Sequence, residues 1–284
     1  MMTFLRAVRG VIAIIVISLI LVPVNIGQVC SLVFLPFSRH WFMRVNMGIK
    51  HFFCSSAARI AVLCGNKLIV TGDPPRQENS IIFANHQSMS DVILIWWWCL
   101  PSDTTRRLNW FAKDSLKRLP GLGWGLRFVN TVFVKRDWSR DADSIRATFA
   151  KIREGNLPNS LVIFPEGTRM KPDKFAASRA YAKRKGLPVL DRVLLPRGKG
   201  IHASLQGLEG YLQSVYDLTI VYDGGAPSLS DFFLKGGYTT RFHAVRYDIK
   251  DVPTRERDLN AWLLNIFVEK DKFVTQAASL AANR

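Results

Sequence analysis

Acidic residues and cysteines are scarce in this 284-residue sequence. Asp and Glu together number 22 against 39 Lys and Arg, so the chain carries a formal charge of +17. The five histidines are scattered, and no C-x-x-C pair occurs among the four cysteines, which are Cys30, Cys54, Cys64 and Cys99. This spacing excludes a zinc finger and predicts reduced thiols, no metal centre and a cytosol-facing protein.

Nucleic-acid-binding motifs are also missing. Strong positive charge attracts polyanions, which include nucleic acid, an anionic membrane surface and a phosphorylated substrate. The sequence shows no zinc-finger spacing, no RNP motif and no clear helix-turn-helix. We therefore expect no nucleic-acid partner and assign the charge to membrane lipid or to a phosphorylated substrate.

A nucleophile supplied by the protein is missing as well. No serine stands in a G-x-S-x-G turn, and no cysteine is placed to attack a substrate. A hydroxyl that the protein activates would then belong to a substrate. This favours group transfer between two bound substrates over hydrolysis or a covalent acyl-enzyme.

One long apolar run is present near the amino terminus. Residues 11–37 contain no charged side chain, and a helix crosses a bilayer with roughly 20 residues. Pro23 and Asn25 interrupt the run. Basic flanks on both sides favour a re-entrant helical hairpin with both ends on the cytoplasmic side. A single span and a cleaved signal peptide are the alternatives. The flanking residues are Arg6, Arg9, Arg39, Arg44 and Lys50.

The next segment, residues 40–65, mixes aromatic and spaced basic side chains. This composition fits a helix lying among lipid headgroups, and equally an amphipathic helix that covers a catalytic core. We divide the chain into membrane-anchoring helices over residues 1–65 and a catalytic domain over residues 66–284.

Strand and helix patterns alternate from residue 66 onward. The alternation predicts an α/β domain with a mixed central sheet flanked by helices on both faces. Residues 108–130 read as a strand fragment, a short helix and a glycine-rich bend. Other strands are expected at 67–73, 80–84, 131–136, 159–165, 188–196, 218–224 and 239–249, and helices after residue 88 and at 141–155, 173–186 and 256–274.

Residues 83–91 read FANHQSMSD and join an apolar strand to an apolar helix. Five residues of a helix turn through about 500°, so His86 and Asp91 share no helix face. They meet only if His86 lies in the loop and Asp91 in the first helical turn, with Ser88 as the N-cap. The pair is then a candidate dyad, in which a carboxylate orients a histidine that removes a proton from a hydroxyl. A helix cap beside a surface histidine is the alternative.

The stretch FPEGTR, residues 164–169, follows a predicted strand. Gly167 allows a tight turn, Thr168 offers a hydroxyl, and Arg169 can bind a phosphate with two parallel hydrogen bonds. A surface salt bridge between Glu166 and Arg169 is the alternative.

Further cations stand at the ends of predicted elements. They are Lys113, Lys135 and Arg136, and the stretch VLLPRGKG adds Arg197 and Lys199 beside apolar residues. That stretch is interpreted either as the wall of a binding pocket or as a simple strand end.

Four motifs follow one another in a fixed order: N-H-x-x-x-x-D, a glycine-rich segment ending in F-V-K-R, F-P-E-G-T-R, and L-L-P-R. From about Lys67 to the carboxyl end the series resembles the glycerolipid acyltransferase family, especially its lysophosphatidic acid and lysocardiolipin acyltransferase branch. The resemblance implies a glycerol-3-phosphate acyltransferase-like fold. It implies that His86 and Asp91 are catalytic, that Lys113 and Arg136 bind the acceptor phosphate, that Glu166, Gly167, Thr168 and Arg169 bind the acceptor, and that Pro196 lies in the fourth motif.

The expected function is transfer of a fatty acyl group from acyl-CoA or acyl carrier protein to a lysophospholipid, with 1-acyl-glycerol-3-phosphate as the main candidate. Backbone N–H groups near the helix start are expected to stabilise the oxyanion. We expect no metal or prosthetic group, and anionic membrane lipid as a partner. The expected place is a membrane, at the cytoplasmic face of the inner membrane if the source is bacterial. Alternatives are a lysophosphatidylglycerol or lysocardiolipin acceptor, and a non-catalytic membrane-surface protein.

Overall fold

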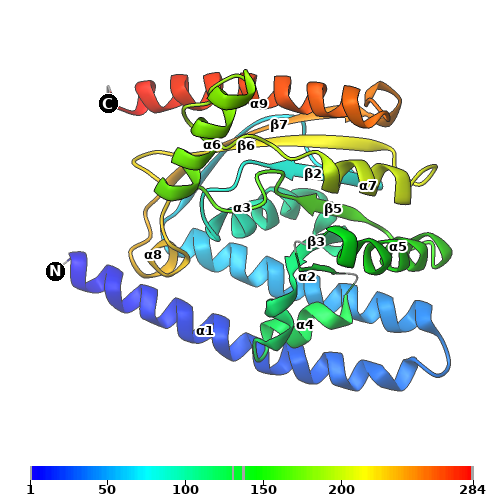
Figure 1. The fold of residues 1–284 in the computed structure, drawn as a ribbon. Helices are drawn as coiled ribbons and strands as arrows, with labels where there is room; N and C mark the ends of the chain where they lie inside the picture. Colours follow the sequence, from blue (N-terminus) through cyan, green and yellow to red (C-terminus); the bar gives the residue numbers. More distant parts are fainter. Residues whose placement is uncertain (1, 130, 136–137, 283–284) are drawn as a thin grey trace.

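A central sheet lies between two layers of helices in the computed structural model, which describes residues 2–129, 131–135 and 138–282 (Figure 1). Within these residues seven strands form one sheet in the order β1-β7-β6-β2-β5-β3-β4. The strands are β1 (Lys67–Gly72), β2 (Ser80–Ala84), β3 (Leu108–Lys113), β4 (Val132–Val134), β5 (Ser160–Ile163), β6 (Ser214–Tyr222) and β7 (Thr239–Asp248).

The sheet is mixed, which confirms the predicted fold class. Strands β2, β3, β4, β5 and β6 run in one direction, and β7 pairs with β6 antiparallel. The edge strand β1 pairs parallel with β7. The carboxyl ends of five neighbouring strands therefore meet at one edge of the sheet, where α/β proteins commonly place their functional residues.

Helices cover both faces because the central strands are apolar on both sides. In β2, Ile82 and Ala84 belong to one buried cluster and Ile81 and Phe83 to the other. The first cluster lies under α2 (Arg39–Leu63), α3 (Ser90–Cys99) and α8 (Leu229–Leu234), and the second under α5 (Trp138–Glu154), α7 (Lys199–Gly207) and α9 (Glu256–Ala282). Helices α1 (Met2–Cys30), α4 (Leu122–Phe128) and α6 (Pro172–Lys185), with the short 3-10 helices η1 (Ser31–Phe34), η2 (Leu100–Ser102), η3 (Thr104–Arg107), η4 (Asp114–Arg118) and η5 (Ile249–Asp251), complete the chain.

Helix α2 covers the core and also keeps an exposed face. Cys54, Ala57 and Ala58 are buried against the sheet side of the molecule, whereas Trp41 and Phe52 are more than half exposed. The buried face confirms a helix that covers the core, and the placement of the exposed face among lipid headgroups stays a prediction.

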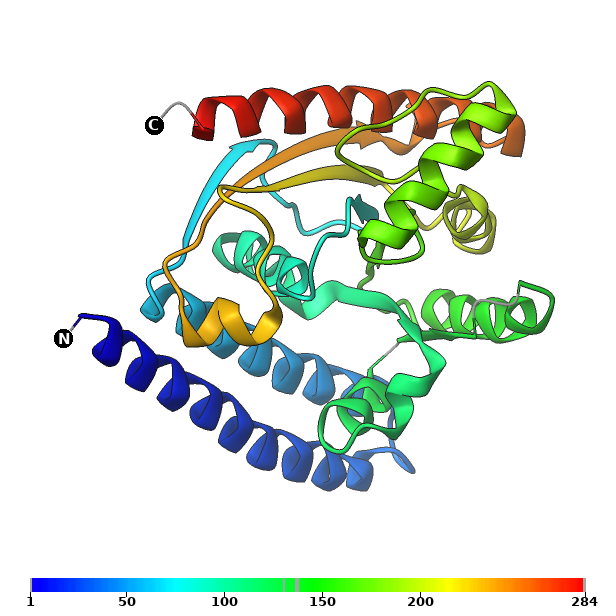
Figure 2. The ribbon, with the colours of Figure 1, turned by 60° about the vertical axis from the view of Figure 1, so that its left-hand side comes forward.

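The interruption predicted at Pro23 and Asn25, which would divide residues 11–37 into the two arms of a hairpin, is wrong. Helix α1 continues through both residues to Cys30, and the chain reverses only after it, in residues 31–38. A proline removes one helical hydrogen bond. Packing holds α1 on both sides of Pro23, since Gly10 lies close to Leu234 of α8 and Gly27 close to Ile49 of α2. Figure 2 shows α1 and α2 side by side below the sheet.

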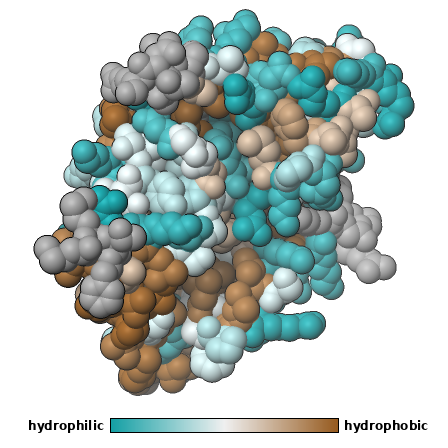
Figure 3. All heavy atoms as spheres, turned by 90° about the vertical axis from the view of Figure 1, so that its left-hand side faces the viewer, coloured by the Kyte–Doolittle hydropathy of each residue, from teal (hydrophilic) through white to brown (hydrophobic). Residues whose placement is uncertain are grey.

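Both ends of α1 are attached to the rest of the protein. Near its start the Arg9 guanidinium donates a hydrogen bond to the Cys64 carbonyl, and near its end Gln28 Nε2 donates to the Gly125 carbonyl at 3.2 Å. The apolar stretch Leu5–Phe34 is long enough to cross a membrane, yet only 17% of its most apolar window is buried in the protein. Figure 3 shows the resulting hydrophobic surface along the side of the molecule where α1 lies.

Two local predictions are also wrong. No strand forms among residues 188–196, because their N–H groups find side-chain acceptors instead of a neighbouring strand. The Asp271 carboxylate of α9 accepts from Asp191, Arg192 and Val193, at 2.5–3.1 Å from its Oδ1. The expected glycine-rich bend before residue 130 is the helix α4.

Candidate active site

The candidate residues gather at the carboxyl edge of the parallel strands. His86 lies two residues beyond β2, Glu166 three residues beyond β5, and Lys113 is the last residue of β3. Strands β2, β5 and β3 are adjacent, so the fold brings together motifs that lie 80 residues apart in the sequence. Arg136 lies outside the described residues.

His86 and Asp91 are in direct contact, as their spacing allowed. His86 stands in the loop before α3 and Asp91 in its first turn, and His86 Nδ1 lies 2.8 Å from Asp91 Oδ2. Asp91 is fully buried, and the His86 side chain is 12% exposed. A carboxylate accepts from Nδ1–H, so the geometry sets the tautomer in which Nε2 is the basic nitrogen.

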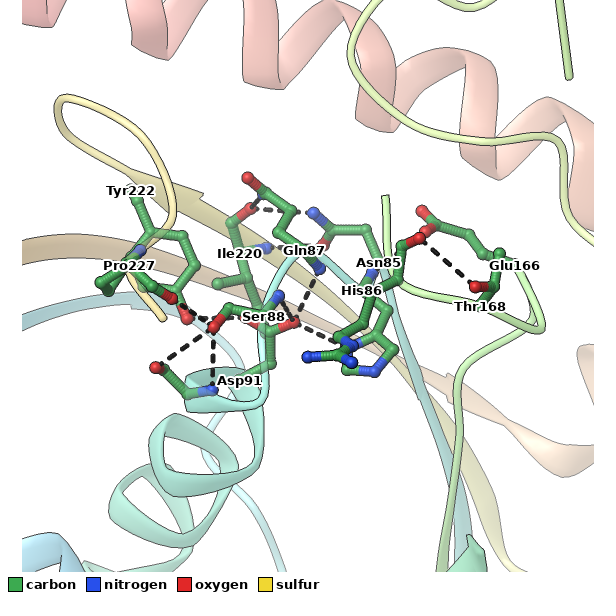
Figure 4. A network of polar contacts seen from close by, with 12 residues as sticks. Asn85, His86, Gln87, Ser88, Asp91, Glu166, Thr168, Ile220, Tyr222 and Pro227 are labelled. Atoms are coloured by element: carbon green, nitrogen blue, oxygen red, sulfur yellow. Dashed lines mark hydrogen bonds and ion pairs between the residues drawn. The ribbon is translucent and has the colours of Figure 1, made fainter. Parts of the chain in front are cut away.

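The same carboxylate also shapes the loop. Asp91 Oδ2 accepts from the N–H groups of Gln87 at 2.8 Å and Ser88 at 2.9 Å (Figure 4). This is one half of the predicted capping box. The other half differs, because Ser88 Oγ accepts from the N–H of Ser90 and donates to the Pro227 carbonyl. The helix begins at Ser90, with Met89 as its N-cap.

The N–H groups at the helix start are occupied by these internal contacts. Those of Gln87 and Ser88 donate to Asp91, that of Ser90 to Ser88 Oγ, and that of Asp91 to the Ser88 carbonyl at 3.2 Å. The expected oxyanion site at these four groups is therefore not supported.

Tyr222 contacts Asp91, and no sequence pattern predicted this contact. Its hydroxyl donates to Asp91 Oδ1 at 2.6 Å, and its ring is buried at the end of β6. Burial, together with the charge of Asp91, raises the pKa of Tyr222 well above its usual value, so the phenol stays a donor. The two residues are 131 positions apart, and no local pattern connects them.

Asn85 also fixes the loop between β2 and α3. Its side chain exchanges two hydrogen bonds with the backbone of Ile220, at 2.9 Å to the carbonyl and 2.8 Å from the N–H. Gln87 Nε2 donates to the same carbonyl at 2.8 Å. The His86 backbone is thereby tied to β6 on both sides of the histidine.

The His86 ring rests on an aromatic surface. It stacks on Phe164 with the ring centres 3.9 Å apart and the planes 14° from parallel, and Phe164 in turn lies against Trp110. The stack and the Asp91 contact together restrict the ring to one orientation.

The FPEGTR turn lies beside the dyad. Glu166 Oε2 accepts from the His86 N–H at 3.3 Å, and the Met170 N–H donates to the His86 carbonyl at 2.8 Å. Gly167 has a φ of +68°, a conformation that favours glycine, and closes the turn by donating to the Phe164 carbonyl at 3.0 Å.

The alternative of a surface salt bridge in this turn is wrong. Glu166 is 3% exposed and faces the His86 backbone, whereas Arg169 is exposed, and no ion pair joins the two in the described residues. Arg197 approaches the same turn. Its N–H donates to the Pro165 carbonyl at 2.9 Å, and its Cδ lies 3.7 Å from the point where a Cβ on Gly167 would stand. Arg169 and Arg197 thus bring two basic residues to the turn that contacts the His86 backbone.

Burial raises the pKa of Glu166 to about 8. The N–H groups of His86 and Leu194 oppose this rise, and the charge of Asp91 adds to it. A carboxyl whose pKa is higher in the folded than in the unfolded protein stabilises the fold below its unfolded pKa. That stabilisation is lost as the pH rises through the folded pKa.

We therefore predict that the melting temperature of the wild type falls between about pH 5 and pH 9 more steeply than that of Glu166→Gln. Thermal unfolding followed by circular dichroism across this range measures both slopes. Parallel slopes would show that Glu166 does not titrate in this interval.

The mixed sheet and the polar residues at its carboxyl edge define an α/β protein with a His–Asp pair as its candidate centre. The chain belongs to the Acyltransferase family, whose sequence model matches residues 67–222, and residues 232–276 match the family described as Acyltransferase C-terminus.

Individual relatives of this chain are also named as acyltransferases. The chain is 33% identical over 214 residues to "Probable 1-acyl-sn-glycerol-3-phosphate acyltransferase 5" of Arabidopsis thaliana. The alignment covers 73% of this chain and 56% of the relative. It is 31% identical over 220 residues to "Lysocardiolipin acyltransferase 1" of Gallus gallus. That alignment covers 76% of this chain and 58% of the relative. The chain thus spans less than two thirds of the length of either relative.

A solved structure shows the same fold. The crystal structure of the 1-acyl-sn-glycerophosphate (LPA) acyltransferase PlsC from Thermotoga maritima superposes with a TM-score of 0.55 over 96% of this chain and 97% of that one. The sequence identity is 18%, so the likeness is one of fold.

Proposed function

We propose that the protein transfers a fatty acyl group from a thioester donor to the free hydroxyl of a lysophospholipid, with 1-acyl-glycerol-3-phosphate as the acceptor. The observation that carries the proposal is the oriented His86–Asp91 pair, whose loop contacts the turn that bears the exposed Arg169. The names of the relatives support the substrate class.

In the proposed reaction His86 Nε2 removes the proton of the acceptor hydroxyl. The alkoxide oxygen attacks the thioester carbonyl, a C–O bond forms, and the C–S bond breaks. The proton then passes from His86 to the leaving thiolate, so the histidine returns to its starting form. The scheme uses no metal and no prosthetic group, and acyl-CoA or acyl carrier protein is a substrate.

In this scheme, holding the two substrates in position contributes as much to the reaction rate as proton removal by His86. Holding two substrates in line is worth effective molarities of about 10⁵–10⁸ M in favourable cases. We assign the acceptor phosphate to Arg169, with Lys113 and Arg136 as further cations and the Glu166–Thr168 turn as their support.

The Arg169→Ala variant is expected to raise the KM for the lysophospholipid about tenfold or more, with a smaller change in kcat. A charged hydrogen bond to phosphate is worth about 1.5–3 kcal/mol, and Arg169 is exposed, so the fold does not depend on it. Steady-state kinetics at saturating acyl-CoA measure the effect. Arg184→Ala, on the exposed face of α6, is the matched control, and equal KM values for wild type and Arg169→Ala would remove Arg169 from the acceptor site.

A second acceptor class has one specific point in its favour, the similarity to lysocardiolipin acyltransferase. A panel of lysophosphatidate, lysophosphatidylglycerol and lysocardiolipin with acyl-CoA separates the two by product formation. Release of free fatty acid alone would indicate a hydrolase, and no product with any acceptor would support a non-catalytic protein.

We further propose that the protein is bound to a membrane through the exposed apolar face of α1, on the cytoplasmic side. Exposed Ile12, Leu19 and Ile26 support this, since a surface helix normally hides such side chains. Recovery in the membrane pellet after an alkaline carbonate wash tests it, and release into the wash would contradict an embedded helix.

A further inference from the structure

A positively charged cavity lies away from the dyad, at the outer edge of the sheet. It has a volume of about 510 Å³ and opens between α2, η4, α4, β4 and α5. Figures 1 and 2 show α4 beside the two amino-terminal helices, where these elements come together. Its lining includes Arg39, Phe42, Lys117, Arg127, Thr131 and Lys151.

The charge of this cavity has one sign. Four of its lining residues are Arg or Lys, and none of the described lining residues is acidic. Lys117 pairs with Asp114 of η4, which neutralises one of the four. The remaining positive charge, on Arg39, Arg127 and Lys151, selects an anion.

A buried hydroxyl in the cavity has no acceptor of its own. Thr131 is 7% exposed, and its Oγ1 makes no hydrogen bond with any described residue. Burying a hydroxyl without a partner is unfavourable, and native proteins rarely do so. An oxygen of a bound anion would accept a hydrogen bond from this hydroxyl and remove the free-energy cost of burying it without a partner.

The wall of the cavity is apolar and continues onto the surface. Phe42 and Phe128 lie in contact with their ring centres 6.1 Å apart, and Lys117 Nζ lies 4.9 Å from the centre of Phe133. Outside the cavity, exposed apolar side chains stand on the neighbouring segments: Phe37, Trp41, Leu119, Leu122 and Trp124. Apolar side chains beneath a group of cations match the boundary between lipid chains and headgroups.

The cavity is separate from the dyad. In the sheet order β2-β5-β3-β4, strand β4 is three positions from β2, or about 14 Å across the sheet. Thr131 precedes β4, whereas His86 follows the carboxyl end of β2. None of the described residues predicted to act in catalysis or acceptor binding lines the cavity.

We propose that this cavity binds the phosphate of an anionic phospholipid of the bilayer, distinct from the substrate of acyl transfer. Thr131 donates to the phosphate, the basic side chains neutralise it, and the phenylalanines face the glycerol and first chain carbons. The proposal rests on the membrane binding proposed above and not on the acyl transfer.

The test is binding of the full-length protein to vesicles of phosphatidylcholine with and without phosphatidylglycerol, measured by co-sedimentation without substrates. Wild type is expected to bind the anionic vesicles more tightly. Thr131→Val should lose a large part of that gain without any change in charge, and Thr131→Ser should keep it. Arg127→Gln/Lys151→Gln should weaken binding about fivefold per removed charge.

The matched control is Lys183→Gln/Lys185→Gln on α6, which removes the same charge on the opposite side of the sheet from α1. Equal weakening by both double variants, with Thr131→Val unchanged, would overturn the proposal in favour of general electrostatic attraction. Unchanged vesicle binding of Thr131→Val with a raised KM for acyl-CoA would assign the cavity to a donor phosphate instead. If acyl transfer fails for every acceptor while the vesicle results hold, only the proposed reaction is refuted.

Discussion

The His86→Ala variant is expected to lose about 10²–10⁴-fold in kcat while keeping a cooperative thermal unfolding transition. The loss follows because no other described base contacts Asp91 in place of the imidazole. The fold persists because the His86 N–H and carbonyl hold Glu166 and Met170 through the backbone, which alanine retains. Acyl transfer with purified protein and circular dichroism measure the two quantities.

His202→Ala is the matched control, since it removes a histidine from α7 rather than from the loop before α3. Full turnover by His86→Ala would refute the assignment of the base. A stable acyl-enzyme with ping-pong kinetics would refute direct transfer between two bound substrates.

The Asp91→Asn variant is expected to lower kcat by about 10²–10⁴-fold and also to lower the melting temperature. The Asp91 carboxylate accepts four hydrogen bonds, from His86 Nδ1, the N–H groups of Gln87 and Ser88, and the Tyr222 hydroxyl. An amide has one accepting oxygen and an NH₂ group that faces other donors, so some of these contacts are lost.

Tyr222→Phe separates the two roles of this carboxylate. It removes one hydrogen bond and leaves His86–Asp91 intact, so we expect a decrease in kcat of about tenfold, the value of one hydrogen bond to a charged group. If Asp91→Asn lowered kcat no more than Tyr222→Phe while lowering the melting temperature, Asp91 would serve as a helix cap only.

Local patterns predicted most of the fold. The alternating strand and helix signals located six of the seven described strands closely, and the four sequence motifs in their fixed order identified the family. The contact between His86 and Asp91 was also predictable, because one short loop carries both. The roles of the site residues stay predictions until the variants are measured.

The wrong and the missed predictions have a common cause. Contacts between residues far apart in the sequence override the local preference for a strand or a helix. Residues 188–196 have the apolar pattern of a strand because Val193 and Leu194 are buried. The Asp271 carboxylate of α9, however, accepts the hydrogen bonds of the N–H groups of residues 191–193. Tyr222 likewise reaches Asp91 only because β6 lies next to β2. Neither relation leaves a periodic signal in the sequence.

The attachment of α1 at both ends has a consequence for how the protein meets a lipid surface. Because Arg9 is hydrogen-bonded to the Cys64 carbonyl and Gln28 to the Gly125 carbonyl, α1 is held to the rest of the protein near both of its ends. If α1 rests in the bilayer, the imidazole of His86 stands at a constant height above the lipid. If the proposed acyl transfer also holds, this height limits which acceptor hydroxyls can reach the imidazole, so the size and tilt of the headgroup would contribute to the proposed substrate selection.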